Sequence, residues 1–382
     1  MRITFYFNRL NHHQAPVADE MSRLIGDSFR FVETCAPNEQ SQKGSNVDYS
    51  SRSYLVKAWE NSESKKESMS LALESDVAVF GAASFDYELL RLRNTDRLSF
   101  ELSERWLKRG AISFFSPKLL KSQWYYHTLF YKKPLYKLCA SAFAANDHYL
   151  MMSFIDKCYK WGYFTKLIEK FEDVPTTTIP HLLWCGRFLD LKHPELLIKL
   201  ADRLKKKKKD FVIDMIGTGP LFDQMRVLAK KHRVDDRIHF KGFMPNEQVL
   251  EEMRRHDIFL FTSDRNEGWG AVANEAMGCG CALVASDAIG SSPYLIQQHQ
   301  TGCMFRSMNL NSLEKEVLWL MEHKDERQKI RFQARQYVNE VWSPAHAAES
   351  LLKLINDLNL GKSCSITSGP CSKALPYYLD KF

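Results

Sequence analysis

The feature that most constrains this chain is the alternation, in its C-terminal half, of short apolar runs with segments of helical period. Leu196, Leu197, Leu200 and Leu204 recur at the spacing of one helix face. Short strands that alternate with helices form parallel sheets through βαβ units. The pattern predicts a doubly wound α/β domain. Its expected strands lie at 182–185, 211–216, 238–240, 258–261 and 282–285.

The N-terminal half shows the same alternation less regularly, with apolar runs at 3–7, 76–81 and 98–102. It predicts a second α/β domain. Between the halves, the segment 171–180 contains two prolines and three consecutive threonines, which disfavour helix and suit a linker. We therefore expect four parts, namely a first domain at 1–175, a second at 176–340, a helical segment at 341–360 and a flexible tail at 361–382.

Composition narrows the functional classes. The 382 residues carry a formal net charge of +7, which suits a protein that handles phosphates or lies near anionic lipid. No finger, RRM signature or helix-turn-helix pattern accompanies that charge, so we expect no nucleic-acid partner. Met1-Arg2 leads directly into a short apolar run, and no segment reaches the ~20 apolar residues of a membrane span, so we expect a cytoplasmic protein. Cys279 and Cys281 form an isolated Cys-x-Cys pair, which is poor evidence for zinc.

The segment 267–280 carries the most chemistry. It follows an expected strand, and ligands of open α/β sheets bind at the carboxyl ends of strands. Gly268 and Gly270 flank Trp269 and allow the backbone to approach a ligand. The expected helix that follows would offer free N–H groups and a positive dipole end to a diphosphate. Glu267 and Glu275 would face hydroxyl groups.

Three further pieces follow successive strands of the same domain. Arg187 comes after Gly186, with Lys192 five residues later. A glycine turn, Gly217-Thr218-Gly219-Pro220, comes next, and Pro220 together with a missing third glycine argues against a dinucleotide fingerprint. Lys241-Gly242-Phe243 is the third piece. Alone, each piece is an ordinary turn or surface charge, and only their joint occurrence points to one ligand site.

Over roughly 182–305, these motifs resemble the retaining glycosyltransferases of family 4, including their E-x7-E region. The resemblance implies the GT-B architecture, with two doubly wound Rossmann-like domains facing a central cleft. It implies a UDP- or GDP-sugar donor, with neither metal nor cofactor. Its residue roles are neutralisation of the diphosphate by Arg187 and Lys192, ribose binding by Glu275, orientation of the donor sugar by Glu267, and nucleotide contacts from Gly217, Gly219, Lys241, Phe243 and the loop Gly268, Trp269 and Gly270.

The resemblance also implies that the first domain binds the acceptor. Many family members carry a histidine at the end of a strand in that domain, but the corresponding segment here, 98–105, has none. Loops at strand ends often carry function, so the segment 8–14 and the turn after 76–81 are alternatives. The candidate residues on the acceptor side are His13, Gly81, Glu101 and Glu104.

We therefore expect a metal-independent hexosyltransferase that acts on a saccharide or lipid-linked saccharide in surface polysaccharide biosynthesis. Retention is usually explained by front-side attack, in which the leaving phosphate takes the acceptor's proton. A sugar-nucleotide epimerase and a non-catalytic sugar-nucleotide-binding module are the alternatives. The stretch 118–137 interleaves lysines with aromatic residues and fits either a peripheral membrane contact or a packed helix with snorkelling lysines. The base, the sugar, the acceptor, the linkage and the oligomeric state stay open.

Overall fold

The computed structural model describes residues 1–37, 48–82, 85–166 and 179–377. The chain divides into two compact units. The first unit contains Met1–Lys166 together with Val341–Tyr378, and the second contains Leu167–Glu340. Each unit is built on its own parallel sheet.

The sheet of the first unit has the strand order β3-β2-β1-β4-β5-β6-β7 in the described residues. Its strands are β1 Ile3–Phe7, β2 Phe29–Glu33, β3 Leu55–Lys57, β4 Val77–Phe80, β5 Ser99–Ser103, β6 Leu135–Cys139 and β7 Cys158–Lys160. Its helical elements are α1 Ala15–Ile25, η1 Gly26–Ser28, α3 Ser62–Glu74, α4 Phe85–Asn94, η2 Gly110–Phe115, α5 Pro117–Gln123, η3 Trp124–Leu129, α6 Ala144–Leu150 and α14 Pro344–Asn359. The order reverses between β1 and β4, as in doubly wound sheets.

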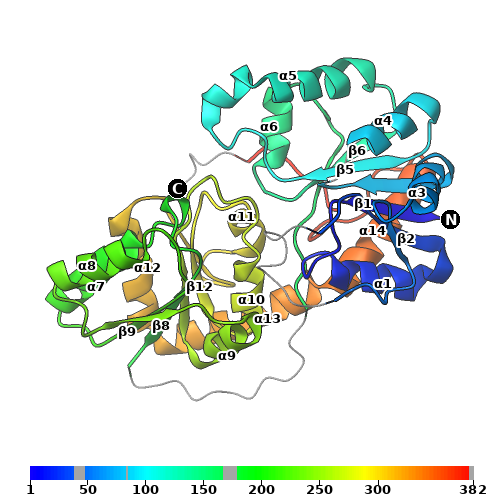
Figure 1. Cartoon of the computed structure of the whole chain (residues 1–382). Coiled ribbons are helices and arrows are strands. Elements are labelled where there is room, and N and C mark those ends of the chain that lie inside the picture. The colour runs from blue at the N-terminus through cyan, green and yellow to red at the C-terminus, as the bar shows by residue number, and fades with distance from the viewer. Residues whose placement is uncertain (38–47, 83–84, 167–178, 378–382) are drawn as a thin grey trace. The chain divides into compact units, whose positions relative to one another are not determined.

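The sheet of the second unit has the order β10-β9-β8-β11-β12-β13 in the described residues. Figure 1 labels three of its strands, β8, β9 and β12. Its strands are β8 His181–Cys185, β9 Val212–Ile216, β10 Ile238–Gly242, β11 Ile258–Phe261, β12 Ala282–Ser286 and β13 Cys303–Phe305. Its helical elements are η4 Asp190–Lys192, α7 Glu195–Lys206, α8 Phe222–Lys231, α9 Asn246–Arg255, α10 Val272–Gly278, α11 Ser292–Leu295, α12 Leu310–Glu322 and α13 Lys324–Glu340.

Burial explains why the strands of the second unit read as continuous apolar runs. Leu182 and Trp184 of β8 belong to a core cluster that also contains the apolar faces of α7 and α12. Leu183 points to the opposite face of the sheet and is buried as well. A parallel strand that is covered on both faces has no solvent-exposed face, so apolar and polar residues do not alternate along it.

The reversal point of the second sheet lies between β8 and β11, which pair in parallel through Ile258 with Leu182 and Phe259 with Leu183. Connections on either side of such a point leave in opposite directions and open a crevice at the carboxyl ends of the two strands. The loops that carry Arg187 and Glu267 both begin at this edge.

The predicted fold of two doubly wound α/β domains is confirmed, and the expected strands and the helix after 195 are present. The predicted linker and the boundary at 175 lie outside the described residues, apart from the end of the linker at 179–180. The predicted C-terminal helix is α14, which packs against α1 within the first unit.

The prediction of a flexible tail at 361–382 is wrong for its described part. Cys371, Ser372 and Ala374 are buried. Their backbones extend the first sheet, because the Cys371 N–H donates to the Lys160 carbonyl at 2.7 Å and the Ala374 N–H donates to the Cys158 carbonyl at 3.0 Å. Glycine, serine and proline suggested disorder, but the free edge of β7 offers those residues backbone partners.

Candidate functional site

The centre of the site in the second unit is an ion pair between the Lys192 ammonium and the Glu267 carboxylate. Lys192 ends the short η4 turn after β8, and Glu267 lies in the loop after β11. The two side chains are 18% and 15% exposed, so the pair is shielded but reachable. Arg187, two residues after β8, is exposed at the same sheet edge. The structure thus brings Lys192 and Glu267 together, as the shared edge of their strands requires.

A hydrogen-bonded support fixes the loop that carries Lys192. The Thr262 hydroxyl donates to the Lys192 carbonyl at 2.7 Å, and the Trp184 indole N–H donates to the Thr262 hydroxyl oxygen at 3.1 Å. The Asp264 N–H donates to the Leu191 carbonyl at 2.9 Å. Neither Thr262 nor Trp184 was predicted from the sequence to be a supporting residue. The available signal was that Thr262 is the polar residue that directly follows an apolar strand.

The glycine turn after β9 packs directly against the turn after β8. Gly217 has φ +128°, and a Cβ atom there would overlap the Gly186 carbonyl oxygen. Gly219 has φ +155°, and its Cβ would lie 2.7 Å from the Phe188 carbonyl oxygen. The Phe188 N–H donates to the Thr218 carbonyl at 3.0 Å. These glycines therefore position the segment that carries Arg187, whatever ligand their own backbones contact.

Glu275 lies on α10 and is largely buried. Burial raises its pKa to about 7, although a hydrogen bond with Asn246 opposes the shift. The neighbouring Trp269 side chain is fully buried and donates from its indole nitrogen to Asn274 Oδ1 at 2.8 Å. Gly270 has φ +79°, and a Cβ there would overlap the Phe261 ring. The buried indole therefore supports the loop, and Trp269 could contact a nucleotide only through its backbone.

The segment 241–243 presents two different side chains. Phe243 is 71% exposed, which suits stacking on a flat ligand. Lys241 is already engaged, because its ammonium lies 2.9 Å from Asp214 Oδ2 and 2.9 Å from Glu252 Oε2. Burial lowers the pKa of Lys241, but hydrogen bonds to these two carboxylates outweigh it and leave the pKa raised. Its predicted contact with nucleotide would have to compete with both carboxylates.

Two groups of side chains within the described ranges have the composition of metal ligands. Asp214, Glu252 and His256 form one, but the Lys241 ammonium lies against two of its carboxylates. His299, Cys303 and Glu316 form the other, where the His299 ring nitrogen lies 2.7 Å from Glu316 Oε2. Neither group contains Glu267 or Glu275.

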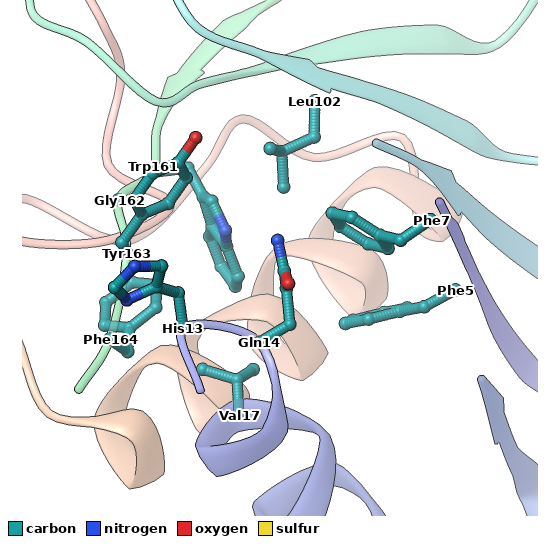
Figure 2. Close-up of a pocket in the computed structure, with 10 residues that line it drawn as sticks. All are labelled: Phe5, Phe7, His13, Gln14, Val17, Leu102, Trp161, Gly162, Tyr163 and Phe164. Carbon is teal, nitrogen blue, oxygen red and sulfur yellow. The ribbon is translucent and has the colours of Figure 1, made fainter. Parts of the chain in front are cut away.

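The first unit holds a separate pocket at the carboxyl ends of its strands, shown in Figure 2. His13 lines it, with its ring stacked on Tyr163 at a centroid distance of 5.4 Å. The Tyr163 hydroxyl donates to Glu104 Oε1 at 2.8 Å. Tyr163 thus contacts both of the predicted acceptor-side residues His13 and Glu104. Tyr163 itself was not predicted from the sequence to belong to the site.

Of the four acceptor-side candidates, His13 alone is among the residues that line this pocket. A Cβ atom on Gly81 would overlap the Phe7 ring, so this glycine makes room for an aromatic wall of the pocket. Glu101 is buried, and its carboxylate pairs with the fully buried Lys137 ammonium. A buried carboxylate without a partner is costly, which explains why these two groups are found together.

Residues 168–337 match the model of the family described as "Glycosyl transferases group 1". The uncharacterized glycosyltransferase MJ1069 of Methanocaldococcus jannaschii is 23% identical over 53% of this chain and 50% of its own length. The putative glycosyltransferase YtcC of Bacillus subtilis is 27% identical over 44% of this chain and 43% of its own length. This chain therefore spans half or less of these relatives.

Among solved structures, Anabaena HepE in complex with UDP superposes with a TM-score of 0.67 at 12% identity, covering 94% of this chain and 100% of HepE. This likeness, with the two parallel sheets, defines the fold class as GT-B. Within that class, the second unit matches the model of the group 1 glycosyltransferases, in agreement with the resemblance seen in its motifs.

Proposed function

We propose that this protein is a retaining, metal-independent hexosyltransferase. It would move a hexose from a UDP- or GDP-sugar to a saccharide or lipid-linked saccharide. The observation that carries the proposal is the Lys192–Glu267 pair, a cation and a carboxylate held together at the reversal point of the second sheet. Relatives point the same way, since HepE was crystallised with UDP and with UDP-glucose.

The positive charge at this edge suits a departing diphosphate. Breaking a glycosyl–phosphate bond transfers negative charge to the phosphate oxygens, and cations already in place stabilise that charge without reorganisation. Lys192 is fixed by the hydrogen bond to its carbonyl from Thr262, whereas Arg187 is exposed and offers a two-pronged contact. These two residues supply the charge that a metal ion would otherwise supply.

Glu267 would change partners when the donor binds. In the structure its carboxylate holds Lys192, and a bound diphosphate would compete for that ammonium. The carboxylate is then available to accept hydrogen bonds from the hydroxyls of the donor sugar. In this proposal neither glutamate is a nucleophile, and the leaving phosphate accepts the acceptor's proton. The retaining outcome itself rests on the resemblance of the 267–275 segment.

Glu275 would bind the nucleotide ribose. Its carboxylate is largely buried, with a pKa raised to about 7 by burial, so it gains from hydroxyl donors that replace lost water. The exposed Phe243 ring would stack on the base. The choice between uracil and guanine is left to experiment.

The setting we propose is surface polysaccharide assembly at the cytoplasmic face of a membrane. Within the described ranges, no helix has the length and apolarity of a membrane span. The region 118–137 divides into two parts, because Tyr125, Tyr126 and Phe130 pack in a core cluster. Trp124 in this region is 51% exposed, and Phe115, which precedes the region, is 82% exposed. Exposed lysines at 118, 121 and 132 flank these rings.

This exposed aromatic and basic surface supports a peripheral contact with anionic lipid. We expect binding to vesicles that contain anionic lipid to decrease as salt is added, because lysine attraction is screened over about 8–10 Å. Phe115→Ser should weaken binding, whereas Phe332→Ser, at a phenylalanine of the second unit that is 71% exposed, should not. If the protein does not bind vesicles at low salt, the proposed membrane contact is wrong, and this region is then a packed helix with snorkelling lysines.

The function is tested by measuring thermal shifts with a panel of UDP- and GDP-sugars, followed by product analysis with saccharide acceptors. A cognate donor stabilises the folded chain in proportion to the logarithm of saturation. A transferase releases nucleoside diphosphate and forms a glycoside. An epimerase would alter the donor with no acceptor, and a binding module would show the shift without turnover.

A further inference from the structure

The pocket of the first unit is built mainly from apolar side chains. Phe5 and Phe7 come from β1, Leu102 from β5, Val17 from α1, and Trp161 and Phe164 from the segment after β7. All six are nearly fully buried. Figure 2 shows the Gln14 amide projecting into the space between Phe7 and Trp161, with the His13 ring beside Tyr163.

Two polar atoms at this pocket have no hydrogen-bond partner within the described part of the chain, namely Gln14 Oε1 and His13 Nδ1. Both are shielded from water, and an unpaired buried polar atom is costly. Burial, with a smaller contribution from the neighbouring His12, lowers the pKa of His13 to about 3. The imidazole is therefore neutral at physiological pH, and both unpaired groups are uncharged.

The lining restricts what can bind. The lining residues include no lysine, arginine, aspartate or glutamate, so a phosphate, a carboxylate or an ammonium would be desolvated without an opposite charge. The cavity is about 20 Å³, and roughly 10–15 Å³ is enough for one water molecule. It therefore accepts a group of methyl size, with the polar atoms of that group directed to Gln14 and His13.

We propose that this pocket binds the acetamido group of an N-acetylated sugar in the acceptor. The methyl enters the space between the aromatic rings, the amide N–H donates to Gln14 Oε1, and the carbonyl accepts from the His13 imidazole. A plain sugar hydroxyl at the same position would satisfy one polar group and leave the apolar space empty. The inference rests on the proposed transferase function, because it assigns the bound sugar to the acceptor.

The pocket is held in shape before any ligand binds. Tyr163 stacks on His13, its hydroxyl donates to Glu104, and Glu104 pairs with Lys108 at 2.6 Å. The missing side chain at Gly81 leaves room for the Phe7 ring. A preformed pocket loses less entropy on binding, which favours recognition of a small group.

Binding of matched methyl glycosides to the full chain, without donor, tests the proposal. The probes are methyl N-acetylglucosaminide and methyl N-acetylgalactosaminide, each against the hexoside that has a hydroxyl in place of the acetamido group. Saturation-transfer NMR should give its largest signal at the acetyl methyl. The acetamido member of at least one pair should bind about tenfold more tightly, the scale of one hydrogen bond plus a buried methyl.

Gln14→Leu should reduce this preference about tenfold, and Gln123→Leu, on α5 of the same unit, serves as the matched control. Should Gln14→Leu fail to fold, Gln14→Met is the second variant, since it keeps the length of the side chain and removes the acceptor oxygen. Equal binding within both pairs, no binding to the folded protein, or a preference that survives in the folded Gln14 variant would overturn the proposal. Turnover of sugar nucleotides is measured separately, so that failure of the transferase function is distinguished from failure of this pocket.

Discussion

Replacing Glu267 with glutamine separates the contact that the structure shows for this carboxylate, with Lys192, from the role that we propose for it, binding of the donor sugar. The amide keeps the shape of the side chain and one acceptor oxygen, but it loses the negative charge that holds Lys192 and that would receive the donor hydroxyls in our proposal. If Glu267 stabilises the donor sugar in the transition state, turnover should fall about 10²–10³-fold. Affinity for free UDP or GDP should stay the same or rise by up to about tenfold, because a competitor for the Lys192 ammonium is gone.

The cost to stability can be worked from the same pair. Both side chains are more than four-fifths buried, and glutamine retains a neutral hydrogen bond to lysine, so the loss is about 1–2 kcal/mol. In a unit of this size that lowers Tm by roughly 2–8 °C. Glu322→Gln is the matched control, since Glu322 is 50% exposed in a surface pair with Lys209 and should change stability by less than about 0.5 kcal/mol.

The assays are calorimetric titration with nucleoside diphosphate and steady-state turnover of the cognate donor, both on folded, monodisperse protein. Nucleotide affinity that falls in parallel with turnover would refute the assignment of Glu267 to the sugar. Turnover within twofold of wild type would show that Glu267 only supports Lys192.

Substitutions at four further positions, Arg187, Lys192, Gly217 and Glu275, probe the rest of the site. Arg187→Ala and Lys192→Ala should each lower kcat/KM about 10²–10³-fold. Arg187→Lys should also be poorly tolerated, because an ammonium cannot make the two-pronged contact of a guanidinium with phosphate oxygens. If these residues are only solvated surface charges, kcat/KM of all three variants would stay within about twofold of wild type. Gly217→Ala should destabilise the chain by about 1–3 kcal/mol and weaken donor binding, because its Cβ overlaps the backbone of Gly186, and thermal unfolding that matches wild type would contradict this contact. Glu275→Ala should weaken nucleotide binding by about 1.5–3 kcal/mol, and calorimetric affinity equal to wild type would show that Glu275 faces elsewhere. Glu275→Gln should stabilise the chain progressively as pH rises from 4.5 to 7, because the Glu275 carboxyl has lost its proton in the unfolded chain over this range but keeps it in the folded chain, where its pKa is about 7. The gain in the free energy of unfolding approaches about 3 kcal/mol above pH 7. A Tm difference between variant and wild type that does not depend on pH would contradict the burial of this group.

The fold could be predicted from the sequence because buried parallel strands are nearly all apolar and the intervening helices are amphipathic, as at β8, α7 and β9. The loops that carry Lys192 and Glu267 follow strands in the middle of such a sheet, so their meeting at one edge followed from topology alone. What stayed hidden depends on side-chain packing.

The residues that were not predicted from the sequence are of types that occur at many positions in any protein. Tyr163 and Thr262 gain their importance only from the atoms they touch, and no spacing in the sequence marks those contacts. Glu101 was expected near the acceptor because it lies close to a strand end, but its position on the strand directs its side chain to Lys137 in the interior. The tail after 361 was predicted from composition, which does not record that a sheet edge is free to pair with it.

The central claim, that Lys192 and Glu267 form a sugar-nucleotide transfer site, is tested most directly by measuring glycoside formation from a panel of UDP- and GDP-hexoses with saccharide acceptors. The account predicts that the wild-type protein uses at least one donor, and that the folded Lys192→Ala variant uses the same donor at least a hundredfold less efficiently. Equal transfer by the wild-type protein and by that variant would contradict it.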